Sequence, residues 1–168
     1  MFPFITQRAI ALATVLTLGF CFACNENPKL LPTPAQPVEK TEKYGTGSVS
    51  RRYQEIGGKK QGLMTDYYPD GRLKAERWFE DDKQTGRTAL YYPGGQIREV
   101  QYYENGLKEG GDTLFYEHGR VQFVANFHRE KKNGYLRKWS PTGDLIFEAR
   151  YEMDSLVEVK GKSIKTVQ

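Results

Sequence analysis

The sequence predicts an all-β fold, an elongated single-layer stack of antiparallel β-hairpins made of about four 24-residue repeats. Three observations predict it: glycines at a fixed spacing, an aromatic content of 13%, and turn-forming residues at regular intervals. Aromatic side chains favour strands because they pack well on a pleated, half-buried surface. The net charge of +4 over 168 residues is too small and too dispersed to indicate a nucleic-acid partner.

The repeat is defined by five columns of residues that align without a gap. Glycines recur every 24 residues, and an aromatic, a second glycine, an aliphatic and a second aromatic follow five, nine, eleven and seventeen residues later. The first three columns are Gly62, Gly86, Gly110 and Gly134; Tyr67, Tyr91, Phe115 and Trp139; and Gly71, Gly95, Gly119 and Gly143. The last two are Leu73, Ile97, Val121 and Leu145; and Phe79, Tyr103, Phe127 and Tyr151. A β-sandwich with irregular hairpins is the alternative, and the constant period argues against it.

Each unit has the chemistry of a β-hairpin. In the first unit, Pro69 presets φ, Asp70 bonds its own backbone and Gly71 accepts a positive φ. A three-residue loop here places Tyr68 opposite Arg72 and Tyr67 opposite Leu73. The same register pairs an aromatic with an aliphatic residue in every unit, and such cross-strand pairs stabilise a sheet by roughly 0.2–1 kcal/mol each.

Alternation of period two assigns the two faces of each strand. In the third unit it places one set on the core face: Val121, Phe123, Ala125 and Phe127. It places the other set on the opposite face: Arg120, Gln122, Val124 and Asn126. Polar connections are expected between successive hairpins, such as 80–85 and 128–133.

The N-terminal 23 residues are typical of a secretory signal peptide. Arg8 precedes an apolar run over residues 9–22, which is shorter than the ~20 residues that span a bilayer as a helix. Ala23 before Cys24 resembles the end of a bacterial lipobox and predicts lipidation of Cys24. Lipidation of Cys21, a plain signal peptide and an uncleaved anchor are the alternatives. The Cys-x-x-Cys spacing also occurs in redox and metal sites, but here no second pair of ligands accompanies it.

These features divide the chain into five segments. They are a signal peptide (1–23), a lipidated cysteine with a Pro-rich tether (24–43), a degenerate first repeat (44–61), four repeats (62–157) and a closing strand or tail (158–168). The tether contains four prolines and no strand pattern, so it is expected to be stiff and extended, with a reach of ~3 Å per residue.

The pattern Gly-x₄-Tyr-Tyr-x₂-Gly-x-Leu, followed by an aromatic strand, resembles the MORN-repeat group in its bacterial variant form. The resemblance covers Gly62 to about Val157. It implies an elongated single-layer stack of hairpins and non-catalytic roles: scaffolding, protein binding, dimerisation and, in some members, association with membrane phospholipid. Some bacterial variants are labelled antitoxins of toxin–antitoxin systems. The sequence departs from the pattern at Ser140, Asn126 and Arg150, which predicts that the fourth unit is a cap.

A stripe of aromatic and arginine residues is the candidate binding surface. Its members are Tyr68, Arg72, Trp78, Tyr92, Arg98, Tyr102, Tyr116 and Arg120. An exposed stripe of this kind would hold a glycan, a peptide or an anionic head group by stacking and bidentate hydrogen bonds. The alternative is that the tyrosines cover the second side of a thin sheet, with arginine and lysine stems packed over them.

No catalytic motif is present, and His118 and His128 have no partner residues at a useful spacing. The sequence therefore predicts no enzyme activity, no metal and no cofactor. The leading hypothesis is a membrane-anchored module for protein binding or scaffolding at the bacterial cell envelope, in the inner or the outer membrane. Open end strands leave a homodimer as an option. The alternatives are an antitoxin-type inhibitor that occludes a partner protein and an envelope-structural protein that binds peptidoglycan or phospholipid.

Overall fold

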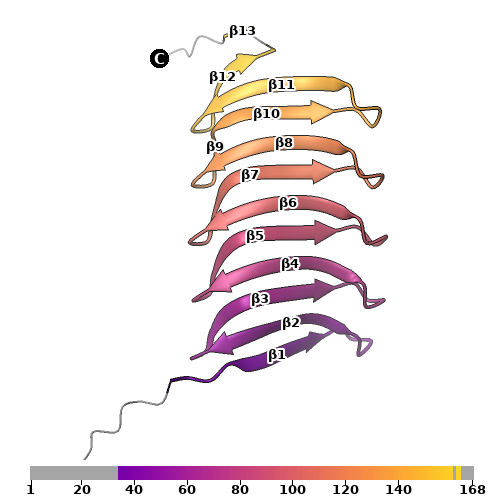
Figure 1. Cartoon of the computed structure of the whole chain (residues 1–168), viewed down its shortest axis with the longest axis vertical. Coiled ribbons are helices and arrows are strands. Elements are labelled where there is room, and N and C mark those ends of the chain that lie inside the picture. The colour runs from indigo at the N-terminus through magenta and orange to yellow at the C-terminus, as the bar shows by residue number, and fades with distance from the viewer. Residues whose placement is uncertain (1–33, 161, 164–168) are drawn as a thin grey trace, which may run out of the picture. The chain divides into compact units, whose positions relative to one another are not determined.

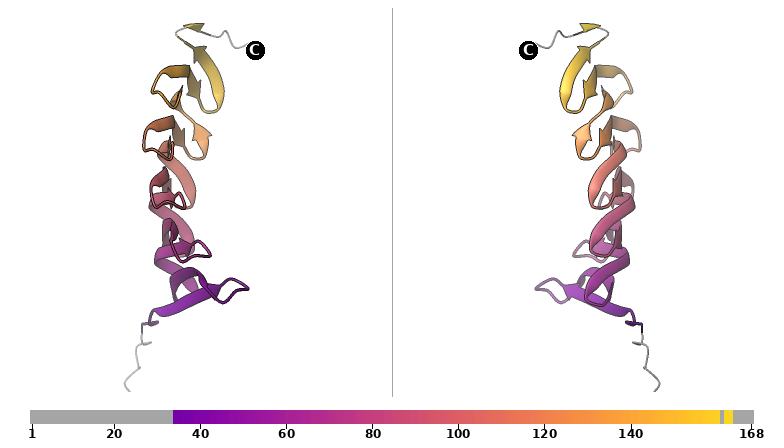
Figure 2. Two further views of the ribbon diagram at one scale, coloured as in Figure 1. Left: turned by 90° about the vertical axis from the view of Figure 1, so that its right-hand side faces the viewer. Right: turned by 90° about the vertical axis from the view of Figure 1, so that its left-hand side faces the viewer.

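The structure, a computed structural model, describes residues 34–160 and the main chain of residues 162 and 163. The predicted signal peptide and the first half of the tether, residues 24–33 with Cys24, lie outside the described residues. Within them the chain forms one antiparallel sheet, in which each strand follows its predecessor as a meander (Figure 1). The two perpendicular views show strongly curved strands that follow one another in a single stack (Figure 2). The predicted all-β, single-layer hairpin stack is confirmed.

The strands alternate between the two directions along the whole sheet. The first seven are β1 (Val38–Lys43), β2 (Val49–Ile56), β3 (Lys59–Tyr67), β4 (Leu73–Glu80), β5 (Lys83–Tyr91), β6 (Ile97–Glu104) and β7 (Leu107–Phe115). The others are β8 (Val121–His128), β9 (Lys131–Lys132), β10 (Gly134–Trp139), β11 (Leu145–Glu152), β12 (Ser155–Val159) and β13 (Lys162–Ser163). The short strand β9 pairs with β8 beside the main order.

The predicted three-residue loop is confirmed in every unit. Tyr67 pairs with Leu73, the Tyr68 N–H donates to the Arg72 carbonyl at 2.8 Å, and Gly71 has a φ of +86°. The three equivalent pairs are Tyr91–Ile97, Phe115–Val121 and Trp139–Leu145. The aromatic and aliphatic columns of the repeat are therefore cross-strand neighbours, as the register predicted.

The connections between these hairpins are also tight turns. Strand β4 ends at Glu80 and β5 begins at Lys83, so only Asp81 and Asp82 connect them, with φ values of +47° and +68°. Positive φ at both central residues is the two-residue turn that matches the twist of antiparallel strands. The connections predicted at 80–85 and 128–133 are thus shorter than expected, and the units form one continuous meander.

Hydrogen bonds to the preceding turn hold these two-residue turns in place. The Asp82 N–H donates to the Lys60 carbonyl at 3.1 Å, and the Lys60 N–H donates to the Asp82 carboxylate at 2.9 Å. The same reciprocal pair recurs between Lys108 and Glu130 and between Lys132 and Asp154. The bond from the main-chain N–H to the carboxylate explains why an acidic residue occupies a position that usually holds glycine. This bond offsets the strain of a positive φ.

The repeat array begins earlier than the sequence predicted. Residues 38–43, assigned to the tether, form β1 and pair with β2. The tether boundary was wrong because this strand is charged and exposed along its whole length, so it lacks the apolar alternation that marks the other strands. Charges on an edge strand discourage pairing with another chain. At the other end, β12 (Ser155–Val159) follows β11 and begins before the closing strand or tail that was expected at 158–168.

A one-residue bulge beside each three-residue loop exchanges the two faces of the sheet. Leu114 pairs with Phe123 but Phe115 pairs with Val121, so Gln122 has no partner. Neighbouring residues on β7 point to opposite faces, and Val121 and Phe123 therefore lie on opposite faces. The predicted assignment was right for Phe123, Ala125 and Phe127 and wrong for Val121 and Gln122. We call the face that carries Phe123 face A and the face that carries Val121 face B.

The fully buried side chains are small, as a single layer requires. Four alanines are no more than 1% exposed: Ala75, Ala89, Ala125 and Ala149. The larger buried apolar residues are Met64 and Leu136, at 6% and 7% exposure. Because no second layer covers the described sheet, its stability depends on hydrogen bonds and contacts between adjacent units.

Candidate binding groove

The tyrosines of the predicted stripe connect adjacent repeats. The Tyr68 hydroxyl donates to the Tyr91 carbonyl at 2.7 Å, and Tyr92 and Tyr116 repeat this bond to Phe115 and Trp139 at 2.7 and 2.8 Å. Tyr44 begins the series with a bond of 2.6 Å to the Tyr67 carbonyl. These rings are half-buried, so the alternative interpretation, in which they cover the thin sheet, describes them better than an exposed binding surface.

Two arginines of the stripe connect the loops in the same direction. A guanidinium nitrogen of Arg72 donates to the Pro93 carbonyl at 2.6 Å. Arg120 bonds the carbonyls of Pro141 and Thr142 at 3.2 and 2.7 Å. Both side chains thus bridge one loop to the next and satisfy main-chain carbonyls there.

The stripe does not form a single surface. The bulge places Tyr68, Tyr92, Tyr116 and Arg98 on face A, where the Lys74 ammonium, one repeat before Arg98, lies 5.8 Å from the centre of the Tyr68 ring. It places Trp78 and Tyr102 on face B, where they are 49% and 45% exposed. The uniform alternation assumed from the sequence was therefore wrong for this set.

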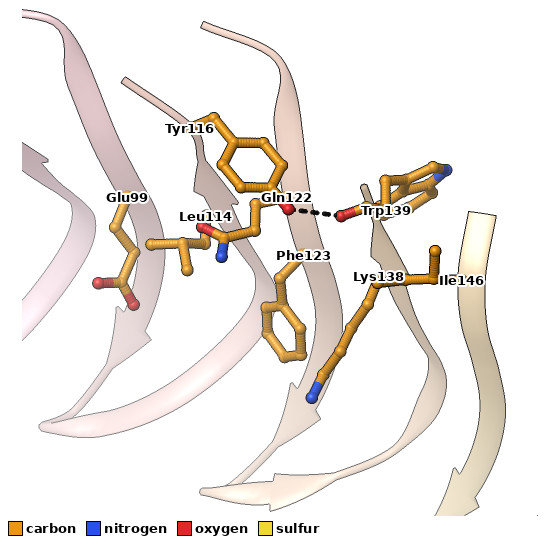
Figure 3. A pocket seen from close by; sticks show the side chains of 8 residues that line it. All are labelled: Glu99, Leu114, Tyr116, Gln122, Phe123, Lys138, Trp139 and Ile146. Atoms are coloured by element: carbon orange, nitrogen blue, oxygen red, sulfur yellow. Dashed lines mark hydrogen bonds between the residues drawn. The ribbon is translucent and has the colours of Figure 1, made fainter. Parts of the chain in front are cut away.

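A groove of about 400 Å³ lies on face A towards the C-terminal end of the sheet. We call it the C-terminal groove. Its lining residues are Glu99, Leu114, Tyr116, Gln122, Phe123, Lys138, Trp139 and Ile146. Figure 3 shows Leu114 and Phe123 between the Glu99 carboxylate on one side and the Lys138 ammonium on the other. Tyr116 closes one side through its bond to the Trp139 carbonyl.

The acidic end of this groove is lined by Glu99, and the buried carboxylate of Asp112 lies near it. Burial raises the pKa of Glu99, and the negative charge of Asp112 raises it further. Asp112 is 5% exposed, and one of its oxygens accepts from the Lys108 ammonium at 2.8 Å. Its other oxygen has no hydrogen-bond partner among the described residues. The Gln101 amide donates to Glu99, and the charges of Lys108 and Arg98 also favour its ionised form. Burial and the charge of Asp112 outweigh these contributions, so a ligand that brings a cation or a donor would be favoured at this end.

The other end is cationic and the floor is apolar. Lys138 pairs with Phe123 across β8 and β10, and its ammonium lies 5.9 Å from the centre of the Phe147 ring. Ile146, 54% exposed, extends the apolar surface beyond Phe123. The groove therefore offers an apolar floor between opposite charges that lie at its two ends.

A second groove, of about 200 Å³, is formed by equivalent positions 72 residues earlier, which is three repeats of 24 residues. Glu42, for example, is equivalent to Leu114. We call it the N-terminal groove. It is lined by Glu42, Tyr44, Ser50, Arg51, Asp66, Tyr67 and Lys74. The seven equivalent residues of the C-terminal groove are Leu114, Tyr116, Gln122, Phe123, Lys138, Trp139 and Ile146. Charged residues at four of these positions are replaced by Leu114, Phe123, Lys138 and Ile146, so the charge at the Asp66 position is reversed.

Ion pairs fill the N-terminal groove. Arg51 donates to Asp66 at 2.6 Å and lies 3.4 Å from Glu42, and Arg77 donates to the second oxygen of Asp66. Burial opposes the ionisation of Asp66, but the hydrogen bonds and charges of Arg51 and Arg77 outweigh it and hold the pKa of the carboxyl below its ordinary value. This groove satisfies its own charges.

Sequence reasoning missed both grooves. The signal was present in the columns four, twelve and thirteen residues after the repeat glycine. The last two are charged in the N-terminal groove and apolar at Ile146 and Phe123, and the first changes from Asp66 through Leu114 to Lys138. These columns lie on the same face only because of the bulge. The change of residue type along them therefore could not indicate a groove before the faces were known.

Known proteins give no further assignment, since no protein-family model matches the chain and no curated protein is significantly similar to it. In the part of the chain that the structure describes, no three His, Cys, Asp or Glu side chains are arranged to hold a metal ion. The same residues contain no helix of the length and apolarity needed to cross a membrane.

Proposed function

We propose that the chain is a non-enzymatic binding module of the MORN-variant kind, anchored to the bacterial cell envelope through Cys24, that binds a protein partner in the C-terminal groove. The observation that carries the proposal is the contrast between the two grooves. One is filled by its own ion pairs, and the other, at the same repeat positions, has an apolar floor and unmatched charges. Exposed apolar surface rimmed by polar groups marks interaction sites on soluble proteins.

The chemistry of the groove describes the segment that it accepts. The volume of about 400 Å³ suits one or two large side chains of a partner rather than a folded element. An apolar side chain would lie on Leu114 and Phe123, with a basic residue on the Glu99 side and a carboxylate on the Lys138 side. Such charge complementarity fixes the direction in which the segment lies. An inhibitory complex of the antitoxin type would use the same contacts.

A photocrosslinking residue in place of Gln122, in the middle of the groove, tests this function. We expect one dominant adduct in the envelope fraction, and its peptides should carry an apolar residue between a basic and an acidic one. The matched control is the same crosslinker at Ser50, the equivalent position of the N-terminal groove, which should give no adduct.

A second variant decides whether the adduct depends on the groove. Phe123→Arg with Ile146→Lys installs the residues that the N-terminal groove has at these positions, Arg51 and Lys74. We expect the adduct to disappear. An adduct that persists in this variant, or that forms equally from position 50, would show that the groove is not the binding site.

The anchor is tested separately by the intact mass of the membrane-extracted protein beside the Cys24→Ala variant. Loss of residues 1–23 with added acyl chains in the wild type alone supports the anchor. An unmodified full-length mass in a soluble fraction contradicts it and favours a cytoplasmic partner.

A further inference from the structure

Face B carries a straight row of exposed side chains that the protein-binding groove does not use. The row takes one residue from each of four successive repeats: Gln54, Trp78, Tyr102 and Asn126. It ends there, because the next repeat has Arg150 at this position, in ion pairs with Glu152 and Glu158. They lie on β2, β4, β6 and β8 at the same position of the unit, and all four are exposed. We call this row the face-B track. Its two central members are aromatic and its two outer members are carboxamides.

The structure gives the track no internal role. Among the described residues, no hydrogen bond involves the side chain of any of its four members. Trp78 and Tyr102 are among the most exposed large apolar side chains of the described sheet, at 49% and 45%. The tyrosines that connect adjacent repeats, such as Tyr92, differ from them. They are half-buried, and their hydroxyls donate to main-chain carbonyls of the next repeat.

The surroundings of the track combine polar and apolar residues. On the neighbouring strands, Arg87 lies opposite Tyr102 and Gly111 lies opposite Asn126. A Cβ atom at Gly111 would meet nothing within 4 Å, so space is free on that side of Asn126, whereas its other side lies against Gly134. At the other end, Gln54 and Trp78 line a hollow of about 390 Å³ whose other walls are both polar and apolar. Leu63, the cross-strand partner of Trp78, is one of its apolar residues, and Glu39 and Arg52 are among its polar ones.

We propose that the face-B track binds a neutral, extended β-1,4-linked oligosaccharide that runs across the strands. Successive track residues are separated by two strand spacings, about 10 Å. In a β-1,4-linked hexose chain each ring is turned over relative to the last, so the same ring face recurs at every second sugar, at a distance close to that separation. Trp78 and Tyr102 then stack on two sugars of identical orientation, with one sugar between them.

The other contacts fit the same ligand. Carboxamides both donate and accept hydrogen bonds, as vicinal hydroxyl groups require, and the Arg87 guanidinium provides donors to the sugar between the two rings. The track members carry no charge, and the charges of Glu39 and Arg52 in the adjoining hollow are opposite. Arg87, the cation opposite Tyr102, has the acidic neighbour Glu76, since both act on Tyr91. Each cation named beside the track therefore has a carboxylate near it, which favours a neutral glycan over a phosphate head group or a polyanion. α-Linked glucans coil, so they do not follow a straight track.

The intrinsic tryptophan fluorescence of the full chain tests the proposal. The chain has two tryptophans, and Trp139→Phe leaves Trp78 as the sole reporter while keeping an aromatic ring, as Phe115 does one repeat earlier. The chain is extracted in a detergent without a sugar head group and titrated with chitohexaose and cellohexaose, which separate the two sources of β-1,4 linkage, with chitobiose and with maltohexaose.

We expect the Trp78 emission to shift on saturation with at least one β-1,4 hexasaccharide, with chitobiose at least about tenfold weaker because it reaches one ring only. Tyr102→Ala should weaken the binding of the hexasaccharide by about tenfold. Calorimetry should detect no binding to Trp78→Ala. Phe123→Arg, on the opposite face, should retain full binding, so failure here and failure of the protein-binding proposal are separable.

Three results would overturn the proposal. They are no shift with either β-1,4 hexasaccharide at millimolar concentration, equal binding of maltohexaose, and unchanged affinity in Tyr102→Ala. Quenching by a peptide or by anionic vesicles in the absence of any response to the sugars would assign the track to a different class of ligand.

Discussion

The N-terminal and C-terminal grooves share a backbone frame and differ in what fills it. In both, a tyrosine hydroxyl bonds a carbonyl of the next repeat, from Tyr44 in one and Tyr116 in the other. The N-terminal groove is then filled by Arg51 and Asp66, whereas the C-terminal groove has Phe123 and Lys138 at these positions. The repeat therefore separates scaffold from site: the columns that bond adjacent units are kept, and the columns that face the groove vary.

The largest effect expected from this comparison is on stability. Asp66→Ala leaves Arg51 and Arg77 without their shared carboxylate in a largely buried place, and we expect the free energy of unfolding to fall by about 3 kcal/mol. Lys138→Ala, at the equivalent position of the other groove, should cost less than about 0.5 kcal/mol. Urea denaturation of both variants measures the difference. Equal losses of stability would mean that internal ion pairs do not distinguish the N-terminal groove from the C-terminal groove.

Removal of the shared tyrosine hydroxyls should affect both grooves alike. Tyr44→Phe and Tyr116→Phe each lose one hydrogen bond to a carbonyl of the next repeat, at 2.6 and 2.8 Å. We expect each to lower the free energy of unfolding by about 1 kcal/mol. Urea denaturation measures both losses. If only one of the two variants loses stability, the tyrosine hydroxyl bond does not stabilise both grooves in the same way.

Acidification should act in opposite directions at the two grooves. The pKa of Asp66 is below its ordinary value, so its stabilising contribution is present at neutral pH and is lost as the pH falls through the folded-state pKa. The pKa of Glu99 is raised, so the folded state binds this proton more tightly and gains stability as the pH falls through the raised pKa towards the ordinary value.

The measurement is the melting temperature from pH 7 to pH 3 for wild type, Asp66→Asn and Glu99→Gln. Glu99→Gln should be slightly more stable than wild type at pH 7, and this advantage should vanish on acidification. Asp66→Asn should lose less stability than wild type as the pH falls. A Glu99→Gln advantage that is independent of pH would contradict the stated cause of the shift.

The smallest expected effect is that of Ile146→Lys. Ile146 is 54% exposed, and the N-terminal groove has lysine at this position, Lys74. We expect the free energy of unfolding to change by less than about 0.5 kcal/mol, while crosslinking from position 122 weakens. A large loss of stability would instead make the apolar floor part of the core.

The hairpin frame of this protein was predictable because its signals are local. Pro69, Asp70 and Gly71 determine the loop, and the loop determines that Tyr67 opposes Leu73. Strand β1 was not predictable, because a charged edge strand has no apolar alternation to detect. The turn of Asp81 and Asp82 was equally hidden, since its positive φ values depend on a bond to Lys60, 22 residues earlier.

The assignment of faces failed for a different reason. Each unit has one unpaired residue, which is Gln122 in the third unit. It shifts every later side chain of its strand to the face opposite to the one that simple alternation from the start of the strand would give. Period two is a rule for an uninterrupted ladder, and no residue type marks this bulge in the sequence, where the position holds serine, lysine, arginine, glutamine and isoleucine in turn. The grooves and the face-B track became visible only with the bulge.

The direction of the strands has a mechanical consequence. They run across the stack, and each ladder, staple and turn bond connects a unit only with the unit beside it (Figure 1). Tension along the stack therefore breaks the hydrogen bonds of one ladder one after another. It does not load all the bonds of a ladder at once in shear. A protein built in this way yields to a pull hairpin by hairpin, lengthens as it yields, and closes again from the units that remain folded.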